Sequence, residues 1–299
     1  MIIDFHAHWW PSNEYVHSRE AWTKTIQGIN QSFYMPAGLE YTNEGLEKLY
    51  FDLDGSALLK QMAESGIDRT VILPLDWGQT NGKPALDIIE QNRAYADLSQ
   101  KYPDKIISFF SIDPKNPDAA RYFETAITQW GMQGLKLYPP TGFFPDDDIC
   151  TPLYEICREH VLPVVFHGTT SPMSEIPYCA PEGFVRLADK FPEMPFVIAH
   201  AGGMEWHTQA LEACQHYENI YLDISGLQAV GDADIFKALI EGIYTALGSF
   251  EQVLFGTDNP IFKGMCHAKD MVAYLKEMNV PEREVSNILG NTARKLLGL

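Results

Sequence analysis

Apolar and polar positions change their period repeatedly along the chain. Short, continuously apolar runs such as 164–166 and 196–198 are typical of parallel strands that are buried on both faces. They alternate with segments such as 119–130 and 182–190, in which apolar residues recur every three or four positions, as on one face of an amphipathic helix. The pattern therefore predicts repeated β-then-α units.

We predict eight strands, at residues 2–8, 70–74, 106–110, 134–138, 163–167, 195–200, 220–224 and 252–258. Helical segments are predicted between and after them, at residues 58–63, 85–102, 119–130, 152–160, 182–190, 208–216, 235–247, 268–278 and 282–297. Eight such units in 299 residues match an α/β fold of the (β/α)8 TIM-barrel type, which typically takes about 250 residues. The alternative, a doubly wound sheet, usually has fewer strands and a Gly-x-Gly-x-x-Gly turn, which is absent after the first strand. Because no linker divides the chain, we expect a single barrel domain over residues 1–299.

A long segment rich in aromatic residues, 9–50, separates the first strand from the first regular helix. Connections of this length are usually either functional or disordered, and the aromatic content argues against disorder. We therefore expect a partly helical insertion after the first strand that covers one end of the fold.

Charge and composition exclude some classes of partner. The chain has 22 basic and 40 acidic residues and a net charge of −18, which argues against binding to nucleic acid or to anionic membranes. The sequence shows neither an apolar run of membrane-spanning length nor a signal-peptide pattern, and its five cysteines are scattered without a Cys-x-x-Cys pair. We expect a cytoplasmic protein with reduced thiols that acts on a small molecule; its oligomeric state is open, with a homodimer as one candidate.

Polar side chains recur where the predicted strands end. These residues are His6 and His8 on the first strand, Lys136 on the fourth, His167 on the fifth, His200 on the sixth and Asp258 on the eighth. The carboxyl ends of the strands in such a barrel meet at one mouth, where the chemistry of the fold is found. We therefore expect these side chains to share one site.

The types of side chain in this set favour a metal. His6 and His8 are two positions apart, so on a strand both imidazoles point to the same face. Neutral imidazoles with a carboxylate suit a divalent ion of the zinc type. An ion with an open coordination position lowers the pKa of bound water from 15.7 toward roughly 7, which allows hydroxide to attack a carbonyl. A histidine outside the ligand set could accept the proton.

Several motifs, in order along nearly the whole chain, resemble the amidohydrolase superfamily. They are residues 4–8 (Asp-Phe-His-Ala-His), 134–139 (Gly-Leu-Lys-Leu-Tyr-Pro), 166–167 (Phe-His), 199–203 (Ala-His-Ala-Gly-Gly), 255–260 (Phe-Gly-Thr-Asp-Asn-Pro) and 291–297 (Asn-Thr-Ala-Arg-Lys-Leu-Leu). Within the superfamily they are most similar to the amidohydrolase-2 branch, which includes aminocarboxymuconate-semialdehyde decarboxylase.

The resemblance implies a role for each of these polar residues. His6, His8, His167 and Asp258 would hold one divalent metal ion, with zinc as the first choice and manganese or a second metal as alternatives. His200 would be the catalytic histidine that activates water or positions the substrate. Asp258 has two roles in such families, metal ligand and proton shuttle, and it is assigned to both here.

Lys136 has two interpretations. In binuclear members of the superfamily a lysine at the end of the fourth strand is carbamylated and bridges two metals. We favour an unmodified Lys136 that holds a substrate carboxylate or phenolate as a point charge. Trp9, Trp10 and Tyr138 are expected to line the substrate pocket. Asp223 is expected to contact substrate or orient a ligand, with a helix-capping role as the alternative.

The resemblance predicts in the first place a metal-dependent hydrolase of a small carboxylated or cyclic substrate, such as a lactone, amide or ester. The alternative is non-oxidative decarboxylation of an aromatic or unsaturated acid at the same site. A third possibility is a metal-binding protein without catalytic activity, and the presence of the complete predicted ligand set together with His200 argues against it.

Overall fold

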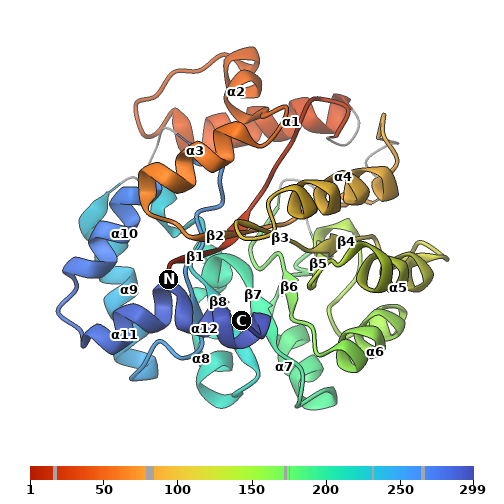
Figure 1. Cartoon of the computed structure of the whole chain (residues 1–299). Helices are drawn as coiled ribbons and strands as arrows, with labels where there is room; N and C mark the ends of the chain where they lie inside the picture. The colour runs from red at the N-terminus through yellow and green to blue at the C-terminus, as the bar shows by residue number, and fades with distance from the viewer. Residues whose placement is uncertain (16–18, 79–83, 172–173, 175, 231, 264–266) are drawn as a thin grey trace.

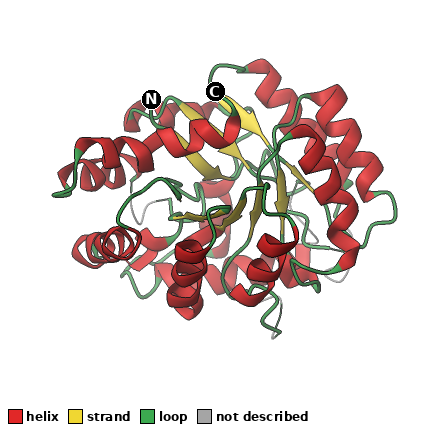
Figure 2. Cartoon of the chain, turned by 90° about the horizontal axis from the view of Figure 1, so that it is seen from below, coloured by secondary structure: helices red, strands yellow, loops and turns green. Residues whose placement is uncertain are grey.

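The computed structural model describes residues 1–15, 19–78, 84–171, 174, 176–230, 232–263 and 267–299. Short parallel strands lie at its centre and helices surround them (Figures 1 and 2). In the described part of the chain the strands are β1 (Ile3–Ala7), β2 (Arg69–Ile72), β3 (Ile106–Ser108), β4 (Phe110–Ser111), β5 (Leu135–Leu137), β6 (Val164–Phe166), β7 (Phe196–Ile198), β8 (Ile220–Asp223) and β9 (Val253–Leu254).

The strands form two parallel sheets, one of β1 to β3 and the other of β4 to β9. Within each sheet, every strand pairs with the next one along the chain. β3 and β4 are the two halves of one predicted strand, since only Phe109 separates them, and they pair with β2 and β5 respectively. At the opposite end, the N–H of Phe5 in β1 donates to the carbonyl of Phe255 at 2.8 Å, and the N–H of Asp258 donates to the carbonyl of His6 at 2.8 Å. The first strand therefore also lies beside the segment that follows the last one. This order confirms the predicted (β/α)8 TIM-type fold.

Helices follow the strands and cover the outside of the sheet (Figure 2). The α-helices in the described residues are α1 (Arg19–Ile29), α2 (Asn43–Tyr50), α3 (Ser56–Ser65), α4 (Ile88–Lys101), α5 (Ala119–Trp130), α6 (Thr151–His160), α7 (Pro181–Lys190), α8 (Gly203–His216), α9 (Ala233–Leu247), α10 (Ala268–Glu277), α11 (Glu282–Ser286) and α12 (Thr292–Leu297). None of these described helices combines the length and the apolar character needed to cross a membrane.

Side chains alternate across the strands, and the alternation places one charge inside the barrel. Leu135 and Leu137 of β5 belong to the large apolar cluster shared with the outer helices. Val165 of β6 belongs to a second cluster, which the strands contribute almost entirely. Lys136, between the two leucines, pairs in register with Val165 and is only 1% exposed. Since an isolated buried ammonium group is costly, this position points to a functional role for the lysine.

The segment after β1 forms the predicted insertion. It contains α1, the π-helix η1 (Asn30–Tyr34) and α2, which lie together with α3 on one side of the barrel (Figure 1). Its inner face is an aromatic cluster that includes Trp22 and Tyr50. The hydroxyl of Tyr34 donates to the carbonyl of Ile261 at 2.8 Å, which fixes the insertion to the segment after β9. The expectation of a partly helical insertion that covers one end of the fold is confirmed.

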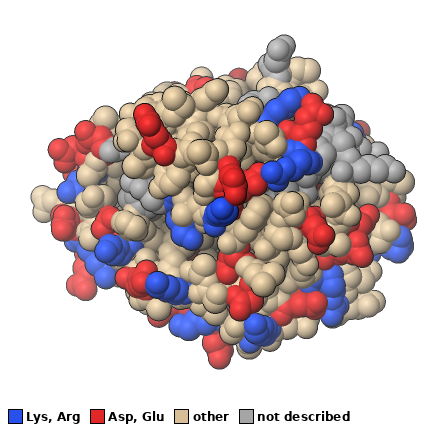
Figure 3. Space-filling view, turned by 90° about the horizontal axis from the view of Figure 1, so that it is seen from above, with Lys and Arg blue, Asp and Glu red and all other residues tan. Residues whose placement is uncertain are grey.

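The outer face of the insertion is charged. Exposed ion pairs join Lys24 to Glu20 at 2.8 Å and Lys48 to Glu44 at 2.9 Å, within α1 and α2 respectively. Figure 3 shows acidic and basic side chains interspersed over the face seen from above Figure 1. Exposed pairs of this kind contribute little to stability, because water and salt screen their charges. The buried aromatic cluster, rather than these pairs, therefore holds the insertion in place.

Candidate functional site

A cavity of about 410 Å³ opens at the mouth of the barrel, beneath the insertion. Its polar floor is formed by the side chains predicted to share a site, namely His6, His8, Lys136, His167, His200 and Asp258. Its walls are largely apolar and come from the insertion and the loops after the strands, and they include Trp10, Trp22, Ile29, Phe33, Leu75, Trp77, Tyr138, Leu227, Ile261 and Phe262. The structure thus brings together residues that lie up to about 250 positions apart in the sequence.

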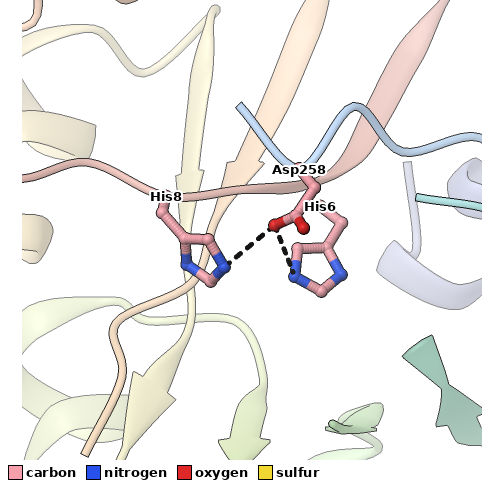
Figure 4. Close-up of side chains that lie close together, drawn as sticks. All are labelled: His6, His8 and Asp258. Carbon is pink, nitrogen blue, oxygen red and sulfur yellow. Dashed lines mark ion pairs between the residues drawn. The ribbon is translucent and has the colours of Figure 1, made fainter. Parts of the chain in front are cut away.

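His6, His8 and Asp258 converge at this floor (Figure 4). Nε2 of His8 lies 3.2 Å from Oδ1 of Asp258, and Nε2 of His6 lies 3.7 Å from the same oxygen. His6 lies in β1, which is buried throughout and whose register with β2 shifts between Asp4 and Ala7. Such a bulge re-aims side chains, and here both imidazoles point to Asp258.

Hydrogen bonds behind the two histidines fix which ring nitrogen carries the proton. Nδ1 of His8 lies 2.6 Å from the carbonyl of Leu73, and Nδ1 of His6 lies 2.5 Å from Oδ2 of Asp223. A carbonyl or carboxylate oxygen only accepts, so each Nδ1 donates and each neutral ring keeps a lone pair on Nε2. His8 and Asp258 then face each other lone pair to lone pair, an arrangement that a cation between them relieves.

Unpartnered atoms support the same conclusion. Among the described residues, Nε2 of His6, Nε2 of His167 and Oδ1 of Asp258 are buried without a hydrogen-bond partner. Leaving such an atom unpaired costs about 1–3 kcal/mol. One ligand atom from each of His6, His8 and Asp258 lies within 4.8 Å of the others. The donor set, two imidazoles and a carboxylate, therefore fits a divalent ion of the zinc or manganese type, with His167 beside it as a further imidazole.

The electrostatics of the floor keep these side chains in the protonation states that could bind a metal. Burial, followed by the nearby Lys136 charge, holds the pKa of His6 well below its ordinary value. Burial and the neighbouring His200 lower the pKa of His167 in the same way. Burial alone would raise the pKa of Asp258, but in the metal-free protein a proton on the facing side of His8 and the positive charges that the neighbouring imidazoles can carry lower it more, so this pKa lies below its ordinary value. At neutral pH these imidazoles are neutral and the carboxylate is ionised, as metal ligation requires.

His200 lies at the same floor but is held differently. It belongs to the turn η5 (Ala199–Gly202), directly after β7, and its φ of 61° is in the left-handed region. Asp258, with a φ of 53°, shares this feature. Non-glycine residues in this region are strained and tend to occur at functional sites. Nδ1 of His200 donates to the carbonyl of Ser225 at 2.9 Å, and burial lowers the pKa of the ring, so a neutral Nε2 is available to the pocket.

Lys136 is the cation of the floor. Burial lowers its pKa to about 8, against the opposing charges of Asp223 and Asp258. Among the described residues its ammonium group makes no ion pair. It is therefore available to an anionic ligand in the cavity. Its neighbour Tyr138 lines the cavity as predicted, with its ring 4.6 Å from that of His167.

Two predicted substrate-binding residues lie elsewhere. Trp9 does not line the cavity: its ring packs on Tyr95 and its Nε1 donates to the carbonyl of Asp52 at 2.7 Å. Trp10, expected to line the pocket together with Trp9, does line it and stacks on His8 at 5.3 Å; the two differ because successive side chains of an extended segment point to opposite sides. Asp223 is also outside the cavity lining. Of the two site roles expected for it, contact with substrate and orientation of a ligand, its position behind His6 fits the second.

Ser225 was missed from the sequence. Its Oγ donates to Oδ2 of Asp223 at 2.9 Å, and its carbonyl accepts from His200, so it joins the supports of His6 and His200. Glu205 and its hydrogen-bonded partners at the cavity mouth were missed as well. Neither residue carries a local sequence signal, since a serine two positions after a strand and a glutamate in a helix are ordinary.

This combination of a barrel, a histidine pair on the first strand and an aspartate after the last is that of a metal-dependent enzyme. The family model described as Amidohydrolase (Amidohydro_2) matches residues 3–299, and the chain belongs to this family. The superfamily resemblance of the sequence motifs is thereby confirmed. No curated protein sequence matches the chain.

Three solved structures illustrate the likeness. An uncharacterized TIM-barrel protein, Bb4693 from Bordetella bronchiseptica, is 23% identical, with a TM-score of 0.74 and coverage of 99% of this chain and 98% of that chain. The 5-carboxyvanillate decarboxylase LigW2 from Novosphingobium aromaticivorans, with bound manganese and 3-methoxy-4-hydroxy-5-nitrobenzoic acid, is 18% identical, with a TM-score of 0.70 and coverage of 100% and 97%. The 2,6-dihydroxybenzoate decarboxylase from Rhizobium is 18% identical, with a TM-score of 0.67 and coverage of 99% and 98%. At these identities the likeness establishes the fold.

Proposed function

We propose that the protein is a divalent-metal-dependent decarboxylase of a small aromatic carboxylic acid. The observation that carries the proposal is the set of unpartnered ligand atoms on His6, His167 and Asp258, at the floor of an aromatic-lined cavity whose free cation among the described lining residues is Lys136. We further propose that His6, His8 and Asp258, with His167, hold one ion, and that it is zinc or manganese.

The structural comparisons favour this function over the hydrolase that the sequence analysis places first. Two of the similar structures are named as decarboxylases of aromatic acids, and one of them contains manganese. The cavity agrees with such a substrate, because its walls are built mainly from aromatic and aliphatic side chains. The hydrolase is therefore the competing outcome of the test below.

Different residues of the cavity would bind the head group and the ring of the substrate. When bound, a divalent ion would polarise and orient an anionic head group. Lys136 supplies a second positive charge at the floor, where low exposure strengthens it. The aromatic walls, such as Trp10 and Trp77, exclude water and stack on a planar ring.

The reaction breaks the bond between the ring carbon and the carboxylate. Carbon dioxide leaves, the electron pair stays on the ring carbon, and that carbon takes up one proton from solvent. His200 can relay this proton, because its Nδ1 is committed to Ser225 and its Nε2 is available to the pocket.

The test is direct. Metal-loaded protein is incubated with hydroxybenzoates in D2O while carbon dioxide release and deuterium at the ring carbon are measured. We expect both signals together, and we expect replacement of His200 by Asn to abolish them while the metal content stays the same. His207, a half-buried histidine outside the cavity lining, supplies the matched control His207→Asn. Hydrolysis of lactones, amides or esters without carbon dioxide release from any acid would overturn the proposal.

A further inference from the structure

The cavity has few charges for its size. Apart from the histidines, its described lining carries three ionisable side chains that are charged at neutral pH, namely Lys136, Asp258 and Glu205. None of the eight arginines of the chain is among the described lining residues. Asp258 faces His6 and His8 and is committed to them. Lys136 is then the one described cationic side chain that can contact an anionic ligand in the cavity.

Glu205 lines the same cavity at a position open to solvent. It is exposed, near the start of α8, whereas Lys136 is 1% exposed. Its carboxylate accepts a hydrogen bond from Thr169 at 3.0 Å and another from Thr170 at 2.8 Å. A hydroxyl has a single proton to donate, so both threonines have committed theirs to Glu205. The mouth therefore presents a fixed negative charge, and these two hydroxyls have no donor left for an anion.

The described walls of the cavity carry no cation besides Lys136. They are dominated by apolar and aromatic side chains, among them Trp10 and Phe262, and their polar groups are neutral, such as the hydroxyl of Ser32 and the indole N–H of Trp22. A carboxylate moved from water into such surroundings without a cation is disfavoured. As far as the described residues line it, the cavity thus accepts one anionic group at its floor and disfavours a second one along the walls and at the mouth.

We infer that the substrate carries a single anionic head group on an otherwise uncharged aromatic body, and that Glu205 is a specificity residue that rejects aromatic dicarboxylates. The inference rests on the proposed function and narrows its substrate class. It separates two kinds of acid named for similar structures, since 5-carboxyvanillate has two carboxylates whereas 2,6-dihydroxybenzoate has one.

The test compares two ligands of nearly the same shape. One is 5-carboxyvanillate, and the other is its 5-carboxamide, in which a planar, uncharged amide replaces one carboxylate. Dissociation constants are measured by titration calorimetry on the manganese-loaded full chain. We expect the amide acid to bind at least about tenfold more tightly than the dicarboxylate.

Variants at the mouth then isolate the contribution of Glu205. We expect Glu205→Gln to narrow the ratio of the two constants several-fold and Glu205→Lys to narrow it further. Because Glu205 is exposed and salt screens exposed charges, the contribution of Glu205 to the ratio of the dissociation constants should shrink in high salt. The control Glu212→Gln, on an exposed position of the same helix outside the cavity lining, should leave the ratio unchanged.

The outcomes distinguish the two proposals. Equal or tighter binding of the dicarboxylate, or a ratio that neither Glu205 variant moves, overturns the inference and leaves the decarboxylase proposal standing. If neither acid binds the metal-loaded protein, the decarboxylase proposal fails and the inference fails with it.

Discussion

Nδ1 of His6 lies 2.5 Å from Oδ2 of Asp223, and neither side chain is exposed. The two residues come from β1 and β8 and are 217 positions apart in the sequence. Asp223 also accepts from the N–H of Ser225 at 2.8 Å, so its carboxylate has a fixed direction. A histidine supported in this way presents its Nε2 to a metal in one orientation and is a better ligand for it.

Replacing Asp223 by Asn should weaken metal binding about 10–100-fold, because a neutral amide oxygen is a weaker acceptor for Nδ1–H of His6 than a carboxylate, and the amide NH2 group cannot accept it at all. The measurement is competition with a chelator of known affinity. Asp104→Asn, at an exposed turn far from the cavity lining, is the matched control and should bind metal like the parent protein. Parent-like affinity of the Asp223→Asn protein would contradict the role assigned to this pair.

The double variant His6→Ala, His8→Ala should lose the metal. Protein prepared without chelator should contain about one ion per chain, and the double variant should contain almost none, because two of the imidazole donors are gone. Elemental analysis checks both. His216→Ala removes an exposed histidine at the end of α8 and should keep the full content. Two ions per chain in the parent protein, with added mass on Lys136, would show a binuclear, carbamylated site instead.

Lys136→Met should stabilise the metal-free fold and weaken ligand binding. Burial lowers the lysine pKa from 10.5 to about 8, so at neutral pH its charged form costs about 3 kcal/mol in the folded protein. Denaturant unfolding should therefore show a gain of about 2–3 kcal/mol for the variant.

The stability difference between the parent protein and Lys136→Met should depend on pH in one direction. The destabilisation by the charged lysine is present below pH 8 and disappears as the pH rises to 10.5, so the free energies of unfolding of the two proteins should converge in alkali. Binding of an aromatic acid should weaken about tenfold or more through the lost charged contact. A destabilised variant would instead indicate that Lys136 has a structural partner.

Asp76, which lies outside the proposed metal site, should make the free energy of unfolding depend on pH in the acid range. It is 9% exposed and accepts from the N–H groups of Asp113 at 2.7 Å and Gly78 at 2.9 Å. Burial nevertheless raises its pKa from 3.8 to about 6. A raised folded pKa contributes stability that is fully present below pH 3.8 and is lost as the pH rises through 6.

Between about pH 4.5 and 7.5 the free energy of unfolding of the parent protein should therefore fall by about 2 kcal/mol relative to Asp76→Asn. Urea unfolding at a series of pH values measures the difference. A difference that stays constant across this range would show that the Asp76 carboxylate is ionised throughout.

Much of the barrel could be predicted from periodicity, since continuous apolar runs and amphipathic segments depend only on neighbouring residues. Several predicted strands are shorter than expected, such as 252–258, of which only Val253–Leu254 is a strand, and the predicted strand 106–110 is divided at Phe109 into β3, which pairs with β2, and β4, which pairs with β5. The two closing helices predicted at 268–278 and 282–297 are present as α10 and as α11 to α12, with a π-helical turn, η7 (Asn287–Asn291), inside the second.

The sequence by itself determined the candidate ligands and their common location. His6 and His8 are two positions apart on a strand, and their alignment follows from local geometry. The strand-end positions of Lys136, His200 and Asp258 follow from the alternation of strands and helices.

Only the tertiary structure decided which side chains support them and which line the cavity. The contact of Asp223 with His6 needs two strands that are distant in sequence, and no local pattern encodes it. Trp9 and Trp10 are alike in sequence, and the packing of Tyr95 on one side and His8 on the other decides which of them faces the cavity. Periodicity specifies elements through short-range sterics, whereas hydrogen-bond partners and cavity walls depend on how those elements pack.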